Sequence, residues 1–97
     1  MAIAIEPQGE IGPDDASLLR DRFIMVLAAV QPERIVVDLS DVPSISDAGL
    51  DALEFGYREA AAKEATVEVV NPAPQVQEQL RSHGLTGVVD DAVARDT

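Results

Sequence analysis

The residues best suited to chemistry lie in one short segment, residues 44–49, which reads S-I-S-D-A-G. Ser46 and Asp47 precede a stretch with helical periodicity, so either side chain can accept a hydrogen bond from the free N–H groups of a helix's first turn. The same position attracts an anion, which makes a phosphate group electrostatically favourable there. We therefore expect Ser46 or Asp47 to cap a helix at this point.

Residues that could act in catalysis or bind a metal are few elsewhere. His83 is the only histidine and cysteine is absent, so one chain cannot assemble a serine–histidine pair, a two-histidine metal site or a thiolate site. We interpret His83 as a charge that complements a helix C-terminus. The carboxylate pairs Asp14-Asp15 and Asp90-Asp91 adjoin no predicted pocket, and no glycine motif for phosphate is present. The sequence predicts no enzyme, no cofactor and no metal site.

Length and composition favour one small domain. The chain has 97 residues and a formal net charge of −11, which disfavours binding to nucleic acid and to anionic lipid. Its longest apolar run, residues 23–30, is too short to span a bilayer, and residues 1–10 lack the pattern of a signal peptide. We expect a single cytoplasmic domain over residues 1–97 without direct membrane insertion, with residues 90–97 as a frayed acidic tail.

The periodicity of the sequence predicts an α/β fold with the order β-β-α-β-α-β-α. Ile3 and Ile5 alternate with alanines, and we expect their strand to pair with a return strand at Ile11 in a hairpin. Residues 34–39 form an apolar run typical of a central strand covered on both faces. Together the elements predict a mixed sheet of four to five strands with about three helices packed on it. The further elements are a helix from Asp14 to about Val30, a helix from Asp47 or Ala48 to about Ala65, a strand over residues 66–70, a helix from Pro74 to Gly84 and, in the five-stranded version, a strand over residues 85–89.

Three separated motifs resemble the STAS domain family, in its branch of anti-sigma factor antagonists. Residues 35–50 read I-V-V-D-L-S-D-V-P-S-I-S-D-A-G-L, close to that family's strand V-V-L-D-L-S followed by V-x-x-I-D-S-S-G-L at a helix start. Gly9-Glu10-Ile11 resembles its G-E-L, and residues 70–74, V-N-P-A-P, resemble its V-N-P-S-P. The resemblance covers almost the whole chain and implies a STAS-like fold.

The resemblance also bears on phosphorylation. In the antagonist branch, the serine immediately before the glycine of this pattern accepts a phosphate from an anti-sigma factor kinase, which releases the partner. Ala48 stands at that position, so the resemblance implies a chain without the usual phosphoacceptor. Ser46 takes the place of the pattern's aspartate and Asp47 that of its first serine, while Gly12 stands where an aspartate commonly follows G-E-L. A displaced phosphosite at Ser44 or Ser46 is the alternative.

The function implied by the resemblance is that of a bacterial regulator of transcription. Its partner would be an anti-sigma factor of the GHKL serine kinase type. The alternative is a scaffold subunit of a membrane transport or stress-signalling assembly with the same fold. We expect a partner to dock on the turn 12–15, the loop 44–47 and the exposed face of the helix that follows, with contacts from Gly12, Asp14, Ser44, Ser46, Asp47, Ala48, Gly49 and Asp51.

Overall fold

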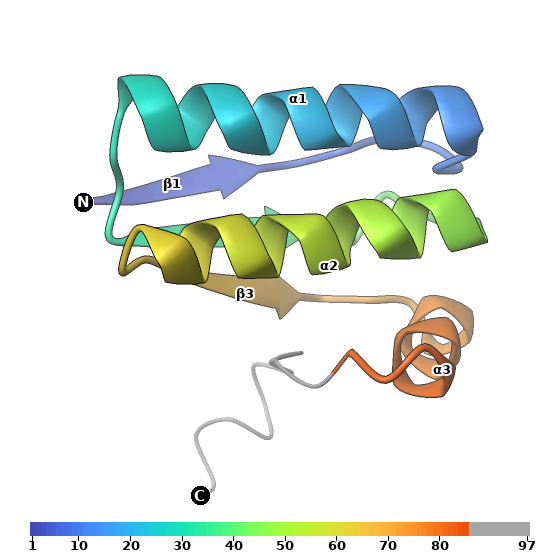
Figure 1. Ribbon diagram of the computed structural model, residues 1–97. Coiled ribbons are helices and arrows are strands. Elements are labelled where there is room, and N and C mark those ends of the chain that lie inside the picture. Colours follow the sequence, from blue (N-terminus) through green and yellow to red (C-terminus); the bar gives the residue numbers. More distant parts are fainter. Residues whose placement is uncertain (86–97) are drawn as a thin grey trace, which may run out of the picture.

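The computed structural model, which describes residues 1–85, contains a sheet of three parallel strands that two helices cover on one face (Figure 1). The predicted α/β class and its three helices are confirmed, whereas the sheet of the described residues has three strands, fewer than the four to five expected. Apart from Leu85, the strand expected over residues 85–89 lies outside the described residues, as does the tail over 90–97. The elements in chain order are β1 (Ala2–Ile5), α1 (Pro13–Ala29), β2 (Arg34–Asp38), α2 (Asp47–Ala62), β3 (Thr66–Val70) and α3 (Pro74–Ser82).

The N-terminal hairpin predicted from the sequence is wrong. β1 pairs in parallel with β2, and Ile11 forms only a single parallel bridge, to Ile45. After β1 the chain does not fold back; it continues beside the loop that follows β2, where the Gly9 N–H donates to the Asp41 carbonyl over 2.9 Å. Alternation of apolar residues identifies a strand, but it does not specify the direction of the neighbouring strand.

The sheet is buried on the face that α1 and α2 cover (Figure 1). Ile35 and Val37 of the central strand β2 are fully buried, as expected for its core positions. Val36 points to the opposite face and is only half-buried, beside an ion pair in which Arg34 Nε lies 3.1 Å from Glu68 Oε2. In the described part of the chain, β2 is therefore covered on one face, and the expectation of cover on both faces is not met.

The helix boundaries follow local signals in the sequence. α1 begins at Pro13, a residue pre-organised for the first helical turn, close to the predicted start. α2 ends at Ala62, before the predicted Ala65, because Glu64 adopts a left-handed backbone conformation with φ of 61°. α3 begins at Pro74 as predicted. None of the helices within residues 1–85 has the length and apolarity needed to cross a membrane.

Two adjacent valines of β2 test the one-sided burial of the sheet. Val37→Ala should lower the free energy of unfolding by about 1.5–3 kcal/mol, because it removes fully buried methyl groups and leaves a cavity. Val36→Ala removes the same atoms from the half-buried face and should cost about 1 kcal/mol or less. Urea denaturation of the two variants measures the difference, and equal costs would contradict the assignment of the faces.

Candidate functional site

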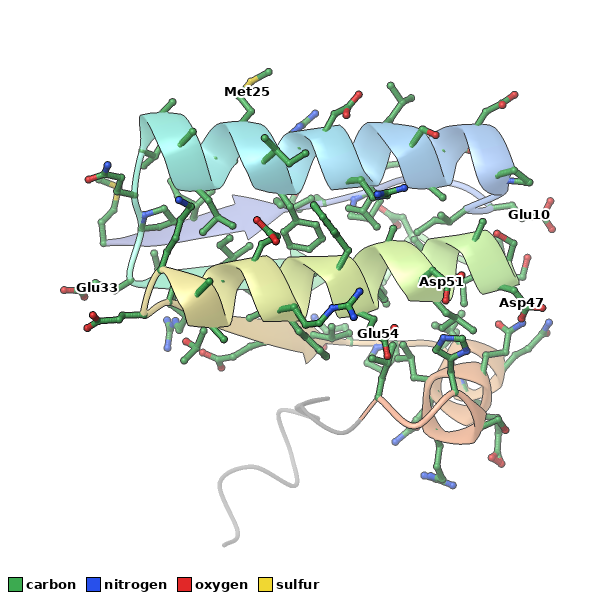
Figure 2. The ribbon with its side chains drawn as sticks, viewed as in Figure 1. Glu10, Met25, Glu33, Asp47, Asp51 and Glu54 are labelled. Atoms are coloured by element: carbon green, nitrogen blue, oxygen red, sulfur yellow. The ribbon has the colours of Figure 1, made fainter. Side chains whose placement is uncertain are left out.

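The predicted docking residues all lie at the carboxyl end of the parallel strands. Each strand of such a sheet leads into a helix at this end, so the N-termini of α1 and α2 lie near each other (Figure 1). The parallel bridge between Ile11 and Ile45 joins the segments that precede these two helices. Asp47 and Asp51 of α2 lie at this end of the molecule together with Glu10 (Figure 2).

The loop before α2 is hydrogen-bonded on two edges, one through the residues on either side of Ile45 and the other through Ile45 itself. On one edge the Ile11 N–H donates to the Ser44 carbonyl over 3.1 Å, and the Ile11 carbonyl accepts from the Ser46 N–H over 2.8 Å. On the other edge the side chain of Gln79 in α3 bonds both backbone groups of Ile45. Its Oε1 accepts the Ile45 N–H over 3.2 Å, and its Nε2 donates to the Ile45 carbonyl over 2.9 Å. Gln79 thus takes the place of a neighbouring strand.

Ser46 is the N-cap of α2, and it is one of the two residues that the sequence predicted for this role. Its Oγ accepts the Gly49 N–H over 3.1 Å, which satisfies one of the free donors of the first turn. Asp47, the other candidate, is the first residue of the helix and its side chain is exposed. Ser44 is engaged elsewhere, because its hydroxyl donates to Glu10 Oε2 over 2.7 Å.

Gly49 allows α2 to approach this loop closely. The residue is buried, and a Cβ atom there would lie 2.6 Å from Ile45 Cγ1 and 2.8 Å from Ile11 Cγ2. There is therefore no room for a side chain at this position without a shift of the two isoleucines. Gly49 thus contributes to the packing of the two isoleucines that hold the loop.

Ala48 lies on the accessible side of the same helical turn. It is half-buried and lines a groove of about 370 Å³ between α1 and α2. Ala16 and Ser17 of α1 face it across this groove, and Asp51 continues the groove on α2. A side chain one atom longer at position 48 would therefore point into a solvent-accessible groove.

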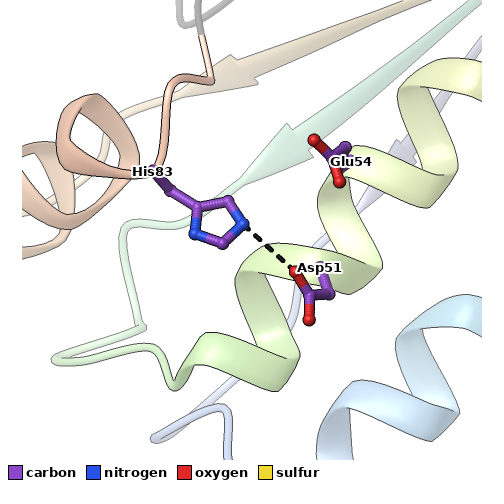
Figure 3. Close-up of side chains that lie close together, drawn as sticks. All are labelled: Asp51, Glu54 and His83. Carbon is purple, nitrogen blue, oxygen red and sulfur yellow. Dashed lines mark hydrogen bonds and ion pairs between the residues drawn. The ribbon is translucent and has the colours of Figure 1, made fainter.

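Three polar contacts of the site were not anticipated from the sequence: those of Glu10, Gln79 and His83. His83 follows the last residue of α3, and its Nε2 lies 3.1 Å from Asp51 Oδ1, with Glu54 on the same side of α2 (Figure 3). Each of these contacts joins residues more than 30 positions apart in the chain. The only local signal was the polarity of Gln79 on a helix whose neighbouring positions Val76 and Leu80 are apolar.

Two ionisable groups have shifted pKa values. Asp38, at the end of β2, accepts hydrogen bonds from the backbone and side chain of Ser40 and from the Asn71 amide, and these bonds hold the pKa of its carboxyl below the ordinary value. Burial raises the pKa of Tyr57 to about 12, so its hydroxyl remains protonated at neutral pH. Neither shift produces a group that exchanges protons near neutral pH, which is what general acid–base catalysis requires.

The comparisons with known proteins agree on the fold. A family model described as "Mlab, STAS domain" matches residues 2–90. The anti-sigma factor antagonist SpoIIAA in its unphosphorylated form is similar in structure, with a TM-score of 0.74 and 15% identity over 97% of this chain and 87% of that one. The phosphorylated form of SpoIIAA from Bacillus has a TM-score of 0.75 and 17% identity, over 99% and 91% of the two chains.

A transport-related protein shares the same fold. A sulfate transporter family protein from Wolinella succinogenes has a TM-score of 0.75 and 18% identity, over 93% of this chain and 76% of that one. No curated protein sequence matches the chain. At these identities the structural likeness concerns the fold.

The cap at Ser46 can be tested by substitution. Ser46→Ala should lower the free energy of unfolding by about 0.5–2 kcal/mol, because the Gly49 N–H loses its partner. Ser46→Asp should retain most of the stability, since aspartate is an equally good N-cap. Thermal unfolding followed by circular dichroism measures both variants, and an aspartate variant as unstable as the alanine variant would argue against the capping role.

Proposed function

Because the chain belongs to the STAS domain family, we propose that it is a regulatory protein-binding domain of the anti-sigma factor antagonist type. Members of this family are generally regulatory domains without enzymatic activity. The observation that carries the proposal is the loop 44–46, which is hydrogen-bonded on both edges and presents the first turn of α2 at the surface. As a single domain in the cytoplasm, it would bind one partner protein through this end.

The docking surface that we propose is acidic. Asp14 and Asp47 are exposed in the first turns of α1 and α2, and Asp51 is exposed one turn further along α2, while Ser44, Ser46 and Ala48 beside them are half-buried. A basic surface on an anti-sigma factor of the GHKL kinase type would complement this charge, and the net charge of −11 would accelerate its encounter with such a partner. Gly12, half-buried before α1, belongs to the same surface.

We propose that phosphorylation does not regulate partner binding at this surface. Ala48 lacks a hydroxyl, although its place in the groove between α1 and α2 would leave a serine accessible to a kinase. The hydroxyls of Ser44 and Ser46 take part in hydrogen bonds within the domain. The chain would then bind its partner constitutively, as a permanently unphosphorylated antagonist.

A second candidate function is that of a scaffold subunit in a membrane transport assembly. The similarity in fold to the sulfate transporter family protein supports it. The two functions differ in the partner, which would be a kinase in the first and a transporter subunit in the second.

The absence of a hydroxyl at position 48 predicts that the wild type and the variant Ala48→Ser differ in phosphorylation. The GHKL-type kinase of the native host, incubated with ATP, should leave the wild-type chain unmodified and should phosphorylate Ala48→Ser, since a helix N-terminus accommodates the added charge. Mass spectrometry of both proteins measures the result. Stoichiometric phosphate on wild-type Ser44 or Ser46 would show that the acceptor had moved rather than disappeared.

Charge reversal tests the position of the docking surface. Asp47→Lys should weaken binding to the kinase about tenfold, mainly by slowing association, because it repels a basic partner surface. Glu33→Lys is the control, since Glu33 is also exposed but lies at the opposite end of the domain (Figure 2). Isothermal titration calorimetry gives both affinities, and equal effects of the two reversals would place the interface elsewhere. Tight binding of a transporter subunit in place of the kinase would favour the second function.

A further inference from the structure

The side chains of Asp51, Glu54 and His83 converge beside the docking surface (Figure 3). Asp51 and Glu54 lie one turn apart on α2, and His83 reaches them from the end of α3. One potential ligand atom from each of the three lies within 4.8 Å of the other two. Their ligand chemistry consists of one imidazole nitrogen and two carboxylate oxygens.

We propose that Asp51, Glu54 and His83 form a binding site for a divalent transition metal ion of the zinc type. An imidazole ligand suits zinc and its neighbours in the periodic table, whereas magnesium and calcium prefer oxygen ligands alone. Three protein ligands leave the fourth position of a tetrahedral ion open to water. This site shares Asp51 with the proposed docking surface and requires no change in the fold.

The geometry is close to what such an ion requires. Ligand distances of about 2.0–2.2 Å from a tetrahedral zinc ion place neighbouring ligand atoms roughly 3.4 Å apart. His83 Nε2 and Asp51 Oδ1 are already 3.1 Å apart. The Asp51 side chain is 67% exposed, so a rotation of its carboxylate can bring the set together without disturbing the core.

The cluster itself carries two carboxylates, and Arg20 and Arg58, which line the same groove, form no ion pair with either of them within residues 1–85. His83 can neutralise at most one of the two carboxylates, and it contacts Asp51. Glu54 is half-buried and forms no ion pair with any residue in the described range 1–85. A divalent ion would compensate both carboxylates at once and would attach the end of α3 to the first turns of α2.

Calorimetry with zinc ions alone tests the site. Titration of zinc chloride into the tag-free protein should show one bound ion per chain, and His83→Gln and Glu54→Gln should each weaken binding at least tenfold. Glu59→Gln is the matched control, because Glu59 is a half-buried carboxylate on the same helix outside the cluster. Its zinc affinity should equal that of the wild type.

A second measurement separates a specific site from general attraction to an acidic protein. Zinc should raise the melting temperature of the wild type and of Glu59→Gln but not that of His83→Gln, because only an ion held by both helices stabilises their contact. Circular dichroism without metal checks that each variant is folded. The absence of zinc binding, binding that survives His83→Gln, or magnesium binding as strong as zinc binding would each overturn the proposal.

Discussion

The backbone of Ile45 is the point on which the candidate site depends. In a parallel bridge, Ile11 uses its own N–H and carbonyl to bond the residues on either side of Ile45, and so the two polar groups of Ile45 itself face away from Ile11. An unpaired polar group in a buried position costs about 1–3 kcal/mol. Gln79 supplies both missing partners, so the segment before α1, the loop before α2 and the helix α3 meet at one residue.

This arrangement means that the site is already formed before any partner binds. The close packing of Gly49 against Ile11 and Ile45 sets the position of α2, and the cap by Ser46 sets the start of that helix. The side chains of the neighbouring turns then project from a backbone whose position is already set. A preformed surface loses less conformational entropy when it binds, which suits the protein-binding function that we propose.

Local features were predictable from the sequence, whereas contacts between distant segments were not. The central strand, the start of α2 and its N-cap each depend on a few consecutive residues, and the sequence predicts the strand and narrows the helix start and the cap to two adjacent residues each. The pairing direction of β1 depends on where the chain goes after Ile5, which the alternation of side chains does not encode. The bonds of Gln79 to Ile45 and of His83 to Asp51 join residues 34 and 32 positions apart, so they depend on how α3 is placed.

Amide hydrogen exchange measured by NMR on the free protein tests directly whether the loop is preformed. If Ile45 is bonded on one edge by Gln79 and flanked on the other by Ile11, its amide and that of Ser46 should exchange almost as slowly as the amide of Val37 in the central strand. Exchange of the Ile45 and Ser46 amides as fast as that of Asp41 in the exposed loop would contradict the account, because it would show that the docking loop is not held in place.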